Sequence, residues 1–179
     1  MSDPVVVSSR SVHDGRIVKL SVEEVRLPNG NTVTLEIIRH PGAAAVVPVD
    51  RDGNAILVRQ YRHATGSYLL EVPAGKLDHP GESPEDCALR EVAEETGYRA
   101  GRMAPLGRFN PFPGSLKVTA HLFLATDLTY VGQRLDPDEE LEVVLLPLAE
   151  VLAMVRQGEC IDGSLQLGVL LAAQHGGLR

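Results

Sequence analysis

Alternating apolar and polar residues dominate the first half of the chain and predict short β-strands. The stretches 17–27 and 32–39 are rich in branched residues and flank the sequence Pro28-Asn29-Gly30-Asn31, which is typical of a β-hairpin turn. Three further strands are predicted at 43–49, 55–61 and 68–72, before Pro73-Ala74-Gly75 ends the run. The first half is therefore expected to be mostly β-sheet.

The pattern then changes to a helical period. Ser83 is a suitable N-cap, Pro84 fits the first helical position, Asp86 can close a capping box, and Gly97 can end the helix. Strands are predicted around 101–109, 118–128 and 142–146, and helices at about 148–157 and from 162–164 through 170. This order predicts an α+β fold, with a mixed sheet between helices and an antiparallel strand region before it.

The central helix carries a cluster of carboxylates. Glu91, Glu94 and Glu95 are three or four residues apart and therefore neighbours on a helix surface, and Arg90 can pair with Glu94 or reach back to Glu82. Like charges at this spacing destabilise a helix unless a cation lies between them. A hard divalent cation with oxygen ligands, Mg²⁺ or Mn²⁺, fits best. The alternative is a solvated, salt-bridged helix face, which is what most charge runs are.

Composition narrows the classes of partner. The 179 residues are enough for one domain with a sizeable core, and the net charge of −7 argues against nonspecific nucleic-acid binding. An anionic substrate would then have to be met by local arginines and a metal ion. Two cysteines are too few for a disulfide framework. We see no apolar signal or membrane-spanning segment, so we expect no membrane association and a cytoplasmic location.

With its flanking residues, the acidic helix resembles the signature of the Nudix hydrolase superfamily. That signature fixes the spacing of a glycine, a glutamate, an Arg-Glu pair, a Glu-Glu pair and a second glycine, and its places are filled by Gly75, Glu82, Arg90, Glu91, Glu94, Glu95 and Gly97. One extra residue separates Gly75 from Glu82, and Tyr98 is a less usual ending. The stretch 39–98 is similar to the ADP-ribose pyrophosphatase branch.

The resemblance implies a Nudix-type α/β/α sandwich that cleaves ADP-ribose to AMP and ribose 5-phosphate with two or three Mg²⁺ ions, or with Mn²⁺ or another divalent cation. Glu91 and Glu95, one turn apart, are the best metal ligands, and Glu94 is the next. Glu82 is expected to be a ligand or an outer partner. A backbone carbonyl near Ala74 or Gly75 can complete the coordination shell, because glycine permits close approach.

A second acidic segment, from Asp136 to Glu142, is predicted to be a loop. In the resembling enzymes a mobile loop in this region delivers a glutamate to the metals or to the attacking water. Glu139 is the better match, with Glu140 as its neighbour, and the alternative is a loop that is simply solvated.

Two arginines of one predicted strand are candidates for substrate binding. Arg62 matches the arginine of the branch's Gln-Tyr-Arg segment, and guanidinium offers paired donors to phosphate oxygens. We expect Arg59 on the same face of the sheet, although a solubilising charge on an edge strand is an equal alternative. Glu71 lies in an apolar strand end, where a buried carboxylate needs a partner, so we expect a structural or substrate-contact role for it.

Gly114 is the last predicted substrate-binding residue, in addition to Ala74. It follows Pro113 where the branch carries a Ser-Pro-Gly turn, but Phe112 replaces the serine, and the glutamate that often follows is absent from Ser115-Leu116-Lys117. The substrate is therefore ADP-ribose or, as alternatives, another nucleoside-diphosphate sugar, a dinucleotide or a nucleoside triphosphate. A noncatalytic nucleotide-sensing module is the remaining class, and it would be expected to lose the acidic helix residues.

We assign residues 1–40 to an N-terminal β region and residues 41–179 to a Nudix hydrolase domain, the two forming a single structural unit. The resemblance implies a homodimer in which the N-terminal strands exchange between subunits and touch the adenosine end of the substrate. The alternative is that the hairpin packs on its own core.

Overall fold

The computed structural model describes residues 2–137 and 139–177, and residue contacts divide the chain into two units. The first unit contains Met1–Gly42 and Asn110–Thr119, and the second contains Ala43–Phe109 and Ala120–Arg179. The segment 110–119 therefore groups with the N-terminal strands and not with its neighbours in sequence. None of the described helices combines the length and apolarity needed to cross a membrane.

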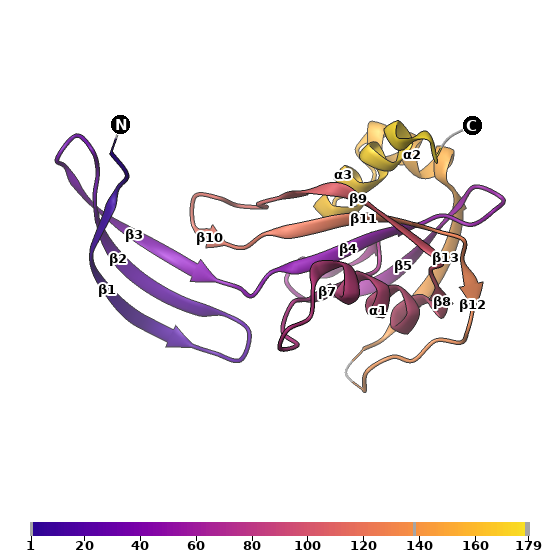
Figure 1. Ribbon diagram of the computed structural model, residues 1–179, viewed down its shortest axis with the longest axis horizontal. Coiled ribbons are helices and arrows are strands. Elements are labelled where there is room, and N and C mark those ends of the chain that lie inside the picture. Colours follow the sequence, from indigo (N-terminus) through magenta and orange to yellow (C-terminus); the bar gives the residue numbers. More distant parts are fainter. Residues whose placement is uncertain (1, 138, 178–179) are drawn as a thin grey trace. The chain divides into compact units, whose positions relative to one another are not determined.

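The N-terminal unit is a four-stranded sheet (Figure 1). Its order is β1-β2-β3-β10, made by Val5–Asp14, Lys19–Arg26, Thr32–Arg39 and Leu116–Lys117. The hairpin of β2 and β3 confirms the sequence prediction, and β10 runs parallel to β3. The strand pattern did not identify β1, because its central residues are polar and all ten of its residues are exposed.

The second unit is built on two sheets and a short ribbon. The mixed sheet has the order β7-β4-β11-β9, formed by Ala74–Lys76, Ala43–Pro48, Ala120–Thr126 and Arg102–Phe109, with β4 and β11 parallel. The antiparallel sheet has the order β13-β5-β6, formed by Leu141–Pro147, Asn54–Arg62 and Ser67–Glu71. The ribbon pairs β8, Tyr98–Arg99, with β12, Thr129–Tyr130.

Helices cover both faces of this unit, which confirms the predicted α/β/α sandwich (Figure 1). The helix α1, Pro84–Thr96, packs Ala88 and Val92 against Val46 and Phe123. The helices α2, Leu148–Gln157, and α3, Gly163–Ala172, cover the opposite core, and a π-helical turn, Ala173–Gly177, follows α3.

One predicted boundary was wrong in a way that matters for the site. The sequence Pro73-Ala74-Gly75 was expected to end the strand run, but Ala74–Lys76 forms β7 and pairs with β4, so that Ala74 lies opposite Ala45. β7 forms by pairing with a strand about thirty residues earlier in the chain, and the three residues Ala74, Gly75 and Lys76 have low strand propensity, so no local pattern predicts it. As a result, the backbone of Ala74 and Gly75 is held rigidly beside α1.

Candidate functional site

The helix α1 is fixed at both ends. The Ser83 hydroxyl accepts a hydrogen bond from the Asp86 N–H (3.1 Å) and donates one to the Asp86 carboxylate (2.7 Å). Gly97 follows the last turn in the left-handed conformation (φ 76°), and its N–H donates to the Ala93 carbonyl. The predicted N-cap Ser83 and the predicted stop at Gly97 are confirmed, whereas Asp86 bonds the Ser83 hydroxyl and not the backbone N–H that a capping box uses. The carboxylates of α1 therefore project from a rigid element.

Arg90 connects the predicted metal ligands. Its guanidinium donates to Glu82 through Nε (2.8 Å) and Nη2 (3.1 Å), and Nη1 donates to Glu91 (2.6 Å) and Glu94 (3.0 Å). Both pairings expected from the sequence, with Glu94 and with Glu82, are present. Arg90 thus bonds both carboxylate oxygens of Glu82, while Glu94 stays partly exposed. Arg90 therefore compensates the negative charge on this side of the cluster.

Glu91 and Glu95 are the two carboxylates of α1 that the fold buries, with 7% and 5% of their surface exposed. Burial raises the pKa of both, and the negative charge of Glu91 adds to burial in raising the pKa of Glu95 to about 8. Two acids desolvated side by side are costly for a structural helix. A bound cation would lower this cost, because it compensates the negative charge of both carboxylates.

The strand β7 closes one side of this acidic pair. The Ala74 N–H donates to the Glu95 carboxylate (3.2 Å), and a Cβ added at Gly75 would lie 1.6 Å from Oε1 of Glu91. Glycine is therefore required there by close approach, and any side chain would displace the Glu91 carboxylate. The backbone of Ala74–Gly75 thus borders both buried carboxylates.

The C-terminal end of α1 is capped by a segment that sequence analysis missed. The Gln133 amide donates to the Glu95 carbonyl (2.6 Å), the Arg134 N–H donates to the Glu94 carbonyl (2.9 Å), and the Val131 N–H donates to the Gly97 carbonyl (2.7 Å). These carbonyls have no partner within the helix. The contact from Gln133 spans 38 residues, and no local pattern signals it.

This cap ties the acidic loop to the helix that carries the buried carboxylates. After the capping segment, two hydrogen bonds join Asp136 and Glu139. The Glu139 N–H donates to the Asp136 carbonyl and the Asp136 N–H donates to the Glu139 carboxylate, both at 3.0 Å. The Glu139 charge contributes, after burial, to the raised pKa of Glu91 and of Glu95, whereas Glu140 is exposed. Asp138 lies outside the described residues.

Arg62 and Glu71 form an ion pair on the neighbouring sheet. Arg62 donates through Nε (2.8 Å) and Nη2 (2.6 Å) to the two carboxylate oxygens of Glu71, which is buried. This is the partner that the sequence required for Glu71.

The expectation that Arg59 shares a sheet face with Arg62 was wrong. The two residues are three positions apart, so a regular strand directs them to opposite faces. Arg59 lies 3.7 Å from Glu142 and over the ring of Tyr68 (4.5 Å to the centroid). Its strand, β5, is also central in its sheet, which excludes the edge-strand alternative.

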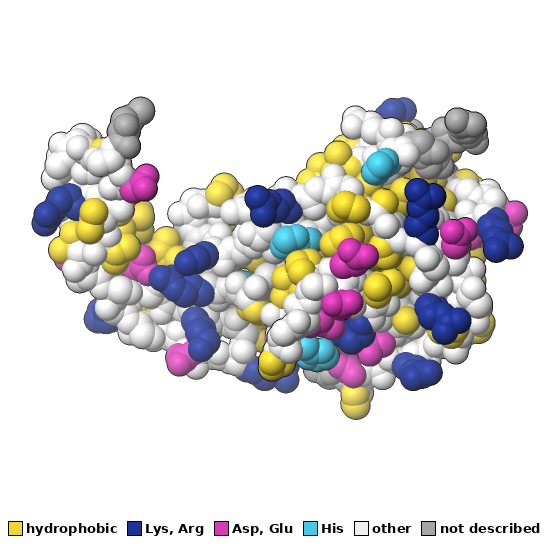
Figure 2. Space-filling model, in the orientation of Figure 1, with side chains coloured by type: hydrophobic (Ala, Val, Ile, Leu, Met, Phe, Trp, Pro, Cys, Tyr) yellow, Lys and Arg dark blue, Asp and Glu magenta, His cyan; other side chains and the backbone are white. Residues whose placement is uncertain are grey.

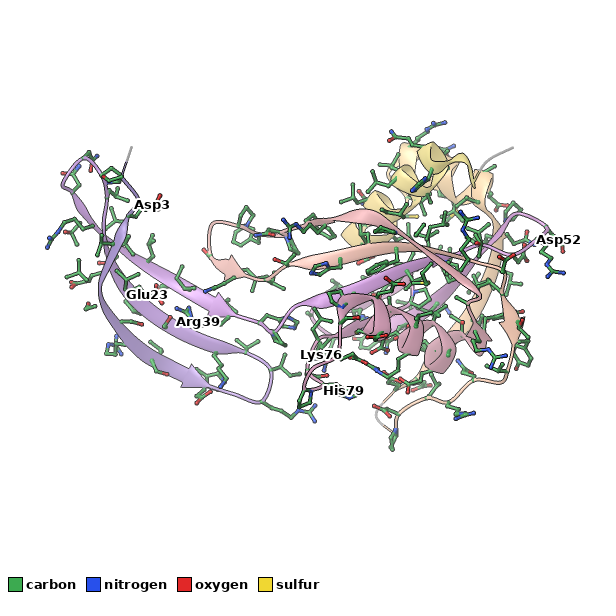
Figure 3. All side chains as sticks on the ribbon, in the orientation of Figure 1. Asp3, Glu23, Arg39, Asp52, Lys76 and His79 are labelled. Atoms are coloured by element: carbon green, nitrogen blue, oxygen red, sulfur yellow. The ribbon has the colours of Figure 1, made fainter. Side chains whose placement is uncertain are left out.

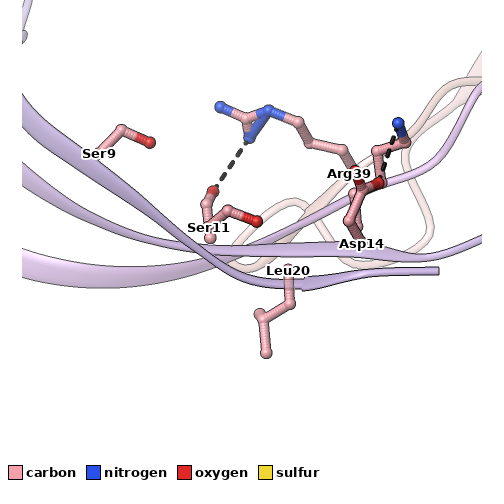
Figure 4. Close-up of a pocket in the computed structure, with 7 residues that line it drawn as sticks. Ser9, Ser11, Asp14, Leu20 and Arg39 are labelled. Atoms are coloured by element: carbon pink, nitrogen blue, oxygen red, sulfur yellow. Dashed lines mark hydrogen bonds and ion pairs between the residues drawn. The ribbon is translucent and has the colours of Figure 1, made fainter.

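Gly114 belongs to the N-terminal unit and is not grouped with the carboxylates of α1. That unit has its own cavity of about 200 Å³, shown in Figure 4, lined by Ser9, Ser11, Asp14, Lys19, Leu20, Ser21 and Arg39. Arg39, which lines this cavity, forms an ion pair with Glu23 of the same sheet; both residues are labelled in Figure 3. None of the predicted site residues lines this cavity.

Glu91 and Glu95, with the Ala74–Gly75 backbone, have the chemistry to hold a hard divalent cation. Figure 2 shows acidic side chains gathered over α1. In the described part of the chain, no three His, Cys, Asp or Glu side chains already converge as a metal site, because Arg90 draws Glu82, Glu91 and Glu94 to itself. The oxygen atoms of these residues fit a divalent cation, and the Arg90 guanidinium supplies the positive charge beside Glu91 and Glu94.

Comparisons with known proteins agree with this geometry. Residues 39–161 match the NUDIX domain. The chain is 38% identical to an ADP-ribose pyrophosphatase of Bacillus subtilis over 94% of this chain and 95% of that protein, and 39% identical to one of Mycobacterium tuberculosis over 92% and 80%. A crystal structure of an ADP compounds hydrolase matches 99% of this chain and 98% of its own, with a TM-score of 0.84 and 25% identity.

Proposed function

The chain belongs to the Nudix family and is a hydrolase, and we propose that it cleaves the pyrophosphate of ADP-ribose to AMP and ribose 5-phosphate with Mg²⁺. The observation that carries this proposal is the pair of buried carboxylates, Glu91 and Glu95, one turn apart on α1 and bordered by the backbone of Ala74 and Gly75. The two relatives named as ADP-ribose pyrophosphatases support the substrate.

The proposed chemistry follows from charge. A pyrophosphate repels an attacking hydroxide, and a bound divalent cation neutralises phosphate oxygens and lowers the pKa of a bound water. Glu91 and Glu95 would hold the cation, together with a carbonyl of the Ala74–Gly75 backbone. Glu94 is a further candidate ligand, whereas Glu82 orients Arg90. Glu139 is close enough to influence both buried carboxylates and is our candidate for positioning the attacking water.

Substrate recognition is assigned to Arg62, whose guanidinium is half exposed on the sheet next to α1. It would contact a phosphate of the substrate. Arg59 points away from this face and is not part of the proposed contact.

A panel of nucleotides tests the substrate. Phosphate released after phosphatase treatment of the products would be measured for ADP-ribose, GDP-mannose, ATP and a dinucleotide with Mg²⁺ at one concentration. We expect the highest kcat/KM for ADP-ribose. A triphosphate or GDP-sugar that exceeds it by roughly tenfold, a difference of about 1.4 kcal/mol, would overturn the substrate but not the hydrolase. No turnover of any nucleotide would favour a sensing module.

The N-terminal unit supports a homodimer as part of the proposal. Its strand β1 is an exposed sheet edge that carries Val5, Val6, Val7 and Val12. Among the described residues of the three N-terminal strands, Val25 is the one apolar residue that is buried. A sheet with so little core of its own needs another surface. We assign that surface to a second copy, whose site would be completed by the strands and by the Gly114 segment.

Light scattering of the full chain tests the dimer. We expect a dimer at micromolar concentration, and we expect removal of residues 1–38 to give a monomer that binds substrate more weakly. A full-length monomer with full activity would rule it out.

We place the enzyme in the cytoplasm. Its two cysteines, Cys87 and Cys160, are both free and buried, as expected in a reducing compartment.

A further inference from the structure

The ion pair between Arg62 and Glu71 is asymmetric. Glu71 exposes 8% of its side chain, whereas Arg62 exposes 45%. Both carboxylate oxygens of Glu71 are occupied, by Nε and Nη2 of the same guanidinium. The buried partner is therefore fully committed to the arginine, while the arginine is still open to solvent.

The way in which Glu71 binds the guanidinium leaves one edge of it for another anion. A guanidinium carries five N–H donors, and the carboxylate takes two of them along the Nε–Nη2 edge. The edge formed by Nη1 and the second hydrogen of Nη2 keeps the paired geometry that suits a phosphate. Glu71 therefore orients Arg62 without consuming its capacity to bind.

The pair lies on the sheet whose strand β5 contacts the acidic helix α1. Glu71 lies opposite Val58 in the β5–β6 ladder, and Arg62 is four residues from Val58, so both side chains leave the same face of the sheet. The Arg62 charge acts on Glu95, and the Glu95 charge acts on Arg62. The guanidinium of Arg62 is thus within electrostatic range of Glu95 on α1, and also of Asp162 at the start of α3.

We propose that Glu71 is a positioning residue, which holds Arg62 by one edge so that the other edge meets a phosphate of the nucleotide substrate. The inference rests on the proposed function, because it requires a pyrophosphate substrate at α1. An arginine held in place before binding loses less conformational freedom when the substrate arrives. Glu71 would then act on substrate affinity through Arg62 and not through the metal site.

A double-mutant cycle tests this role. Steady-state kinetics would be measured for Glu71→Gln, Arg62→Ala and the combined variant, with the nucleotide that the wild-type protein hydrolyses best. We expect Arg62→Ala to raise KM by more than tenfold and Glu71→Gln to raise it several-fold, with a smaller change in kcat. In the Arg62→Ala background, Glu71→Gln should change KM by less than about twofold.

Two further variants keep the test decisive. Arg62→Lys retains a positive charge beside Glu71 but has no second edge, so its KM should rise about as much as that of Arg62→Ala while its melting temperature stays close to wild type. Glu142→Gln, which breaks the ion pair of Arg59 on the same strand, should leave KM unchanged.

Three results would overturn the proposal. They are an equal effect of Glu71→Gln on KM with and without Arg62, a folded Glu71→Gln with wild-type KM, and an Arg62→Lys with wild-type KM. Failure of the proposed function would show differently, as a wild-type protein that turns over no pyrophosphate substrate.

Discussion

The chain carries two acidic segments, α1 and the segment from Asp136 to Glu142, and folding treats them differently. The second was predicted to be a loop throughout, but its last two residues begin β13. On α1, Glu91 and Glu95 are buried, and the pKa of each is raised, first of all by burial. In the loop, Asp136 and Glu140 are exposed, and Glu139 is half-buried. In sequence the two segments look alike, since each is a short run of carboxylates.

The difference teaches that packing, and not the number of charges, separates a reactive acidic cluster from a solvated one. The β7 backbone lies against Glu91 and Glu95 on α1, which removes water from them. The loop is held at its root, where the Gln133 amide donates to the Glu95 carbonyl and the Arg134 N–H donates to the Glu94 carbonyl. Its influence on the site therefore depends on that attachment.

The largest effect is expected from neutralising the buried pair. Glu91→Gln or Glu95→Gln keeps the shape of the side chain and removes a metal-ligand charge, so kcat should fall by about a thousandfold or more. The melting temperature should not fall, because a buried acid with a raised pKa is replaced by a neutral group. Near-normal rates of both folded variants at limiting Mg²⁺ would refute the assignment.

The second-largest loss of activity is expected from Gly75→Ala. Its new methyl group would lie 1.6 Å from Oε1 of Glu91, and the flexible carboxylate would move away before the backbone does. We expect turnover to drop roughly a hundredfold with a small change in stability. The matched control is Gly163→Ala, where an added Cβ meets nothing within 4 Å. Equal activity of the two variants would show that the β7 contact is irrelevant to catalysis.

Within the loop, Glu139 and Glu140 provide an adjacent pair for comparison. Glu139→Gln should lower kcat by about a hundredfold, in the range that removal of a general base produces, and should leave KM almost unchanged. Glu140→Gln should stay within about twofold of wild type, because its side chain is exposed. Reversed effects would assign the role to Glu140, and two silent variants would make the loop a solvated one.

The smallest effect is expected at the root of the loop. Gln133→Ala removes the donor to the Glu95 carbonyl, which should cost about 1 kcal/mol of stability and a few-fold in kcat. Arg134→Ala is the control, because its contact with the Glu94 carbonyl is made by the backbone N–H and survives. Thermal melts and kinetics of both variants would show whether the attachment contributes to turnover.

Most of the site-bearing helix could be predicted from the sequence because its signals are local. Its first turn is specified by Ser83 and Pro84 and its end by Gly97, each from residues close in sequence. The four-residue spacing of Arg90 and Glu94 predicts their contact. The hairpin of β2 and β3 is likewise specified by its own turn residues.

The contacts that complete the site could not be predicted, because they join distant segments. Gln133 meets Glu95 across 38 residues, and β7 exists only by pairing with β4. The segment 110–119 groups with the N-terminal sheet through β10, which has two residues. The prediction for Arg59 was wrong because Arg59 and Arg62 are three positions apart, and side chains an odd number of positions apart on a strand point to opposite faces of the sheet.

Calorimetric titration of Mg²⁺ tests most directly whether the buried pair of α1 is a metal site. Burial and the charge of Glu91 raise the pKa of the Glu95 carboxyl to about 8. We therefore expect the metal-free protein to lose stability as pH rises from about 4.5 towards 8, and we expect Glu95 to keep its proton near pH 7. A cation must displace that proton, and titrations in buffers of different ionisation enthalpy should report release of about one proton per bound ion near pH 7. Release should diminish above about pH 8 and vanish in Glu95→Gln. Absence of Mg²⁺ binding, or identical proton release from Glu95→Gln, would contradict the account.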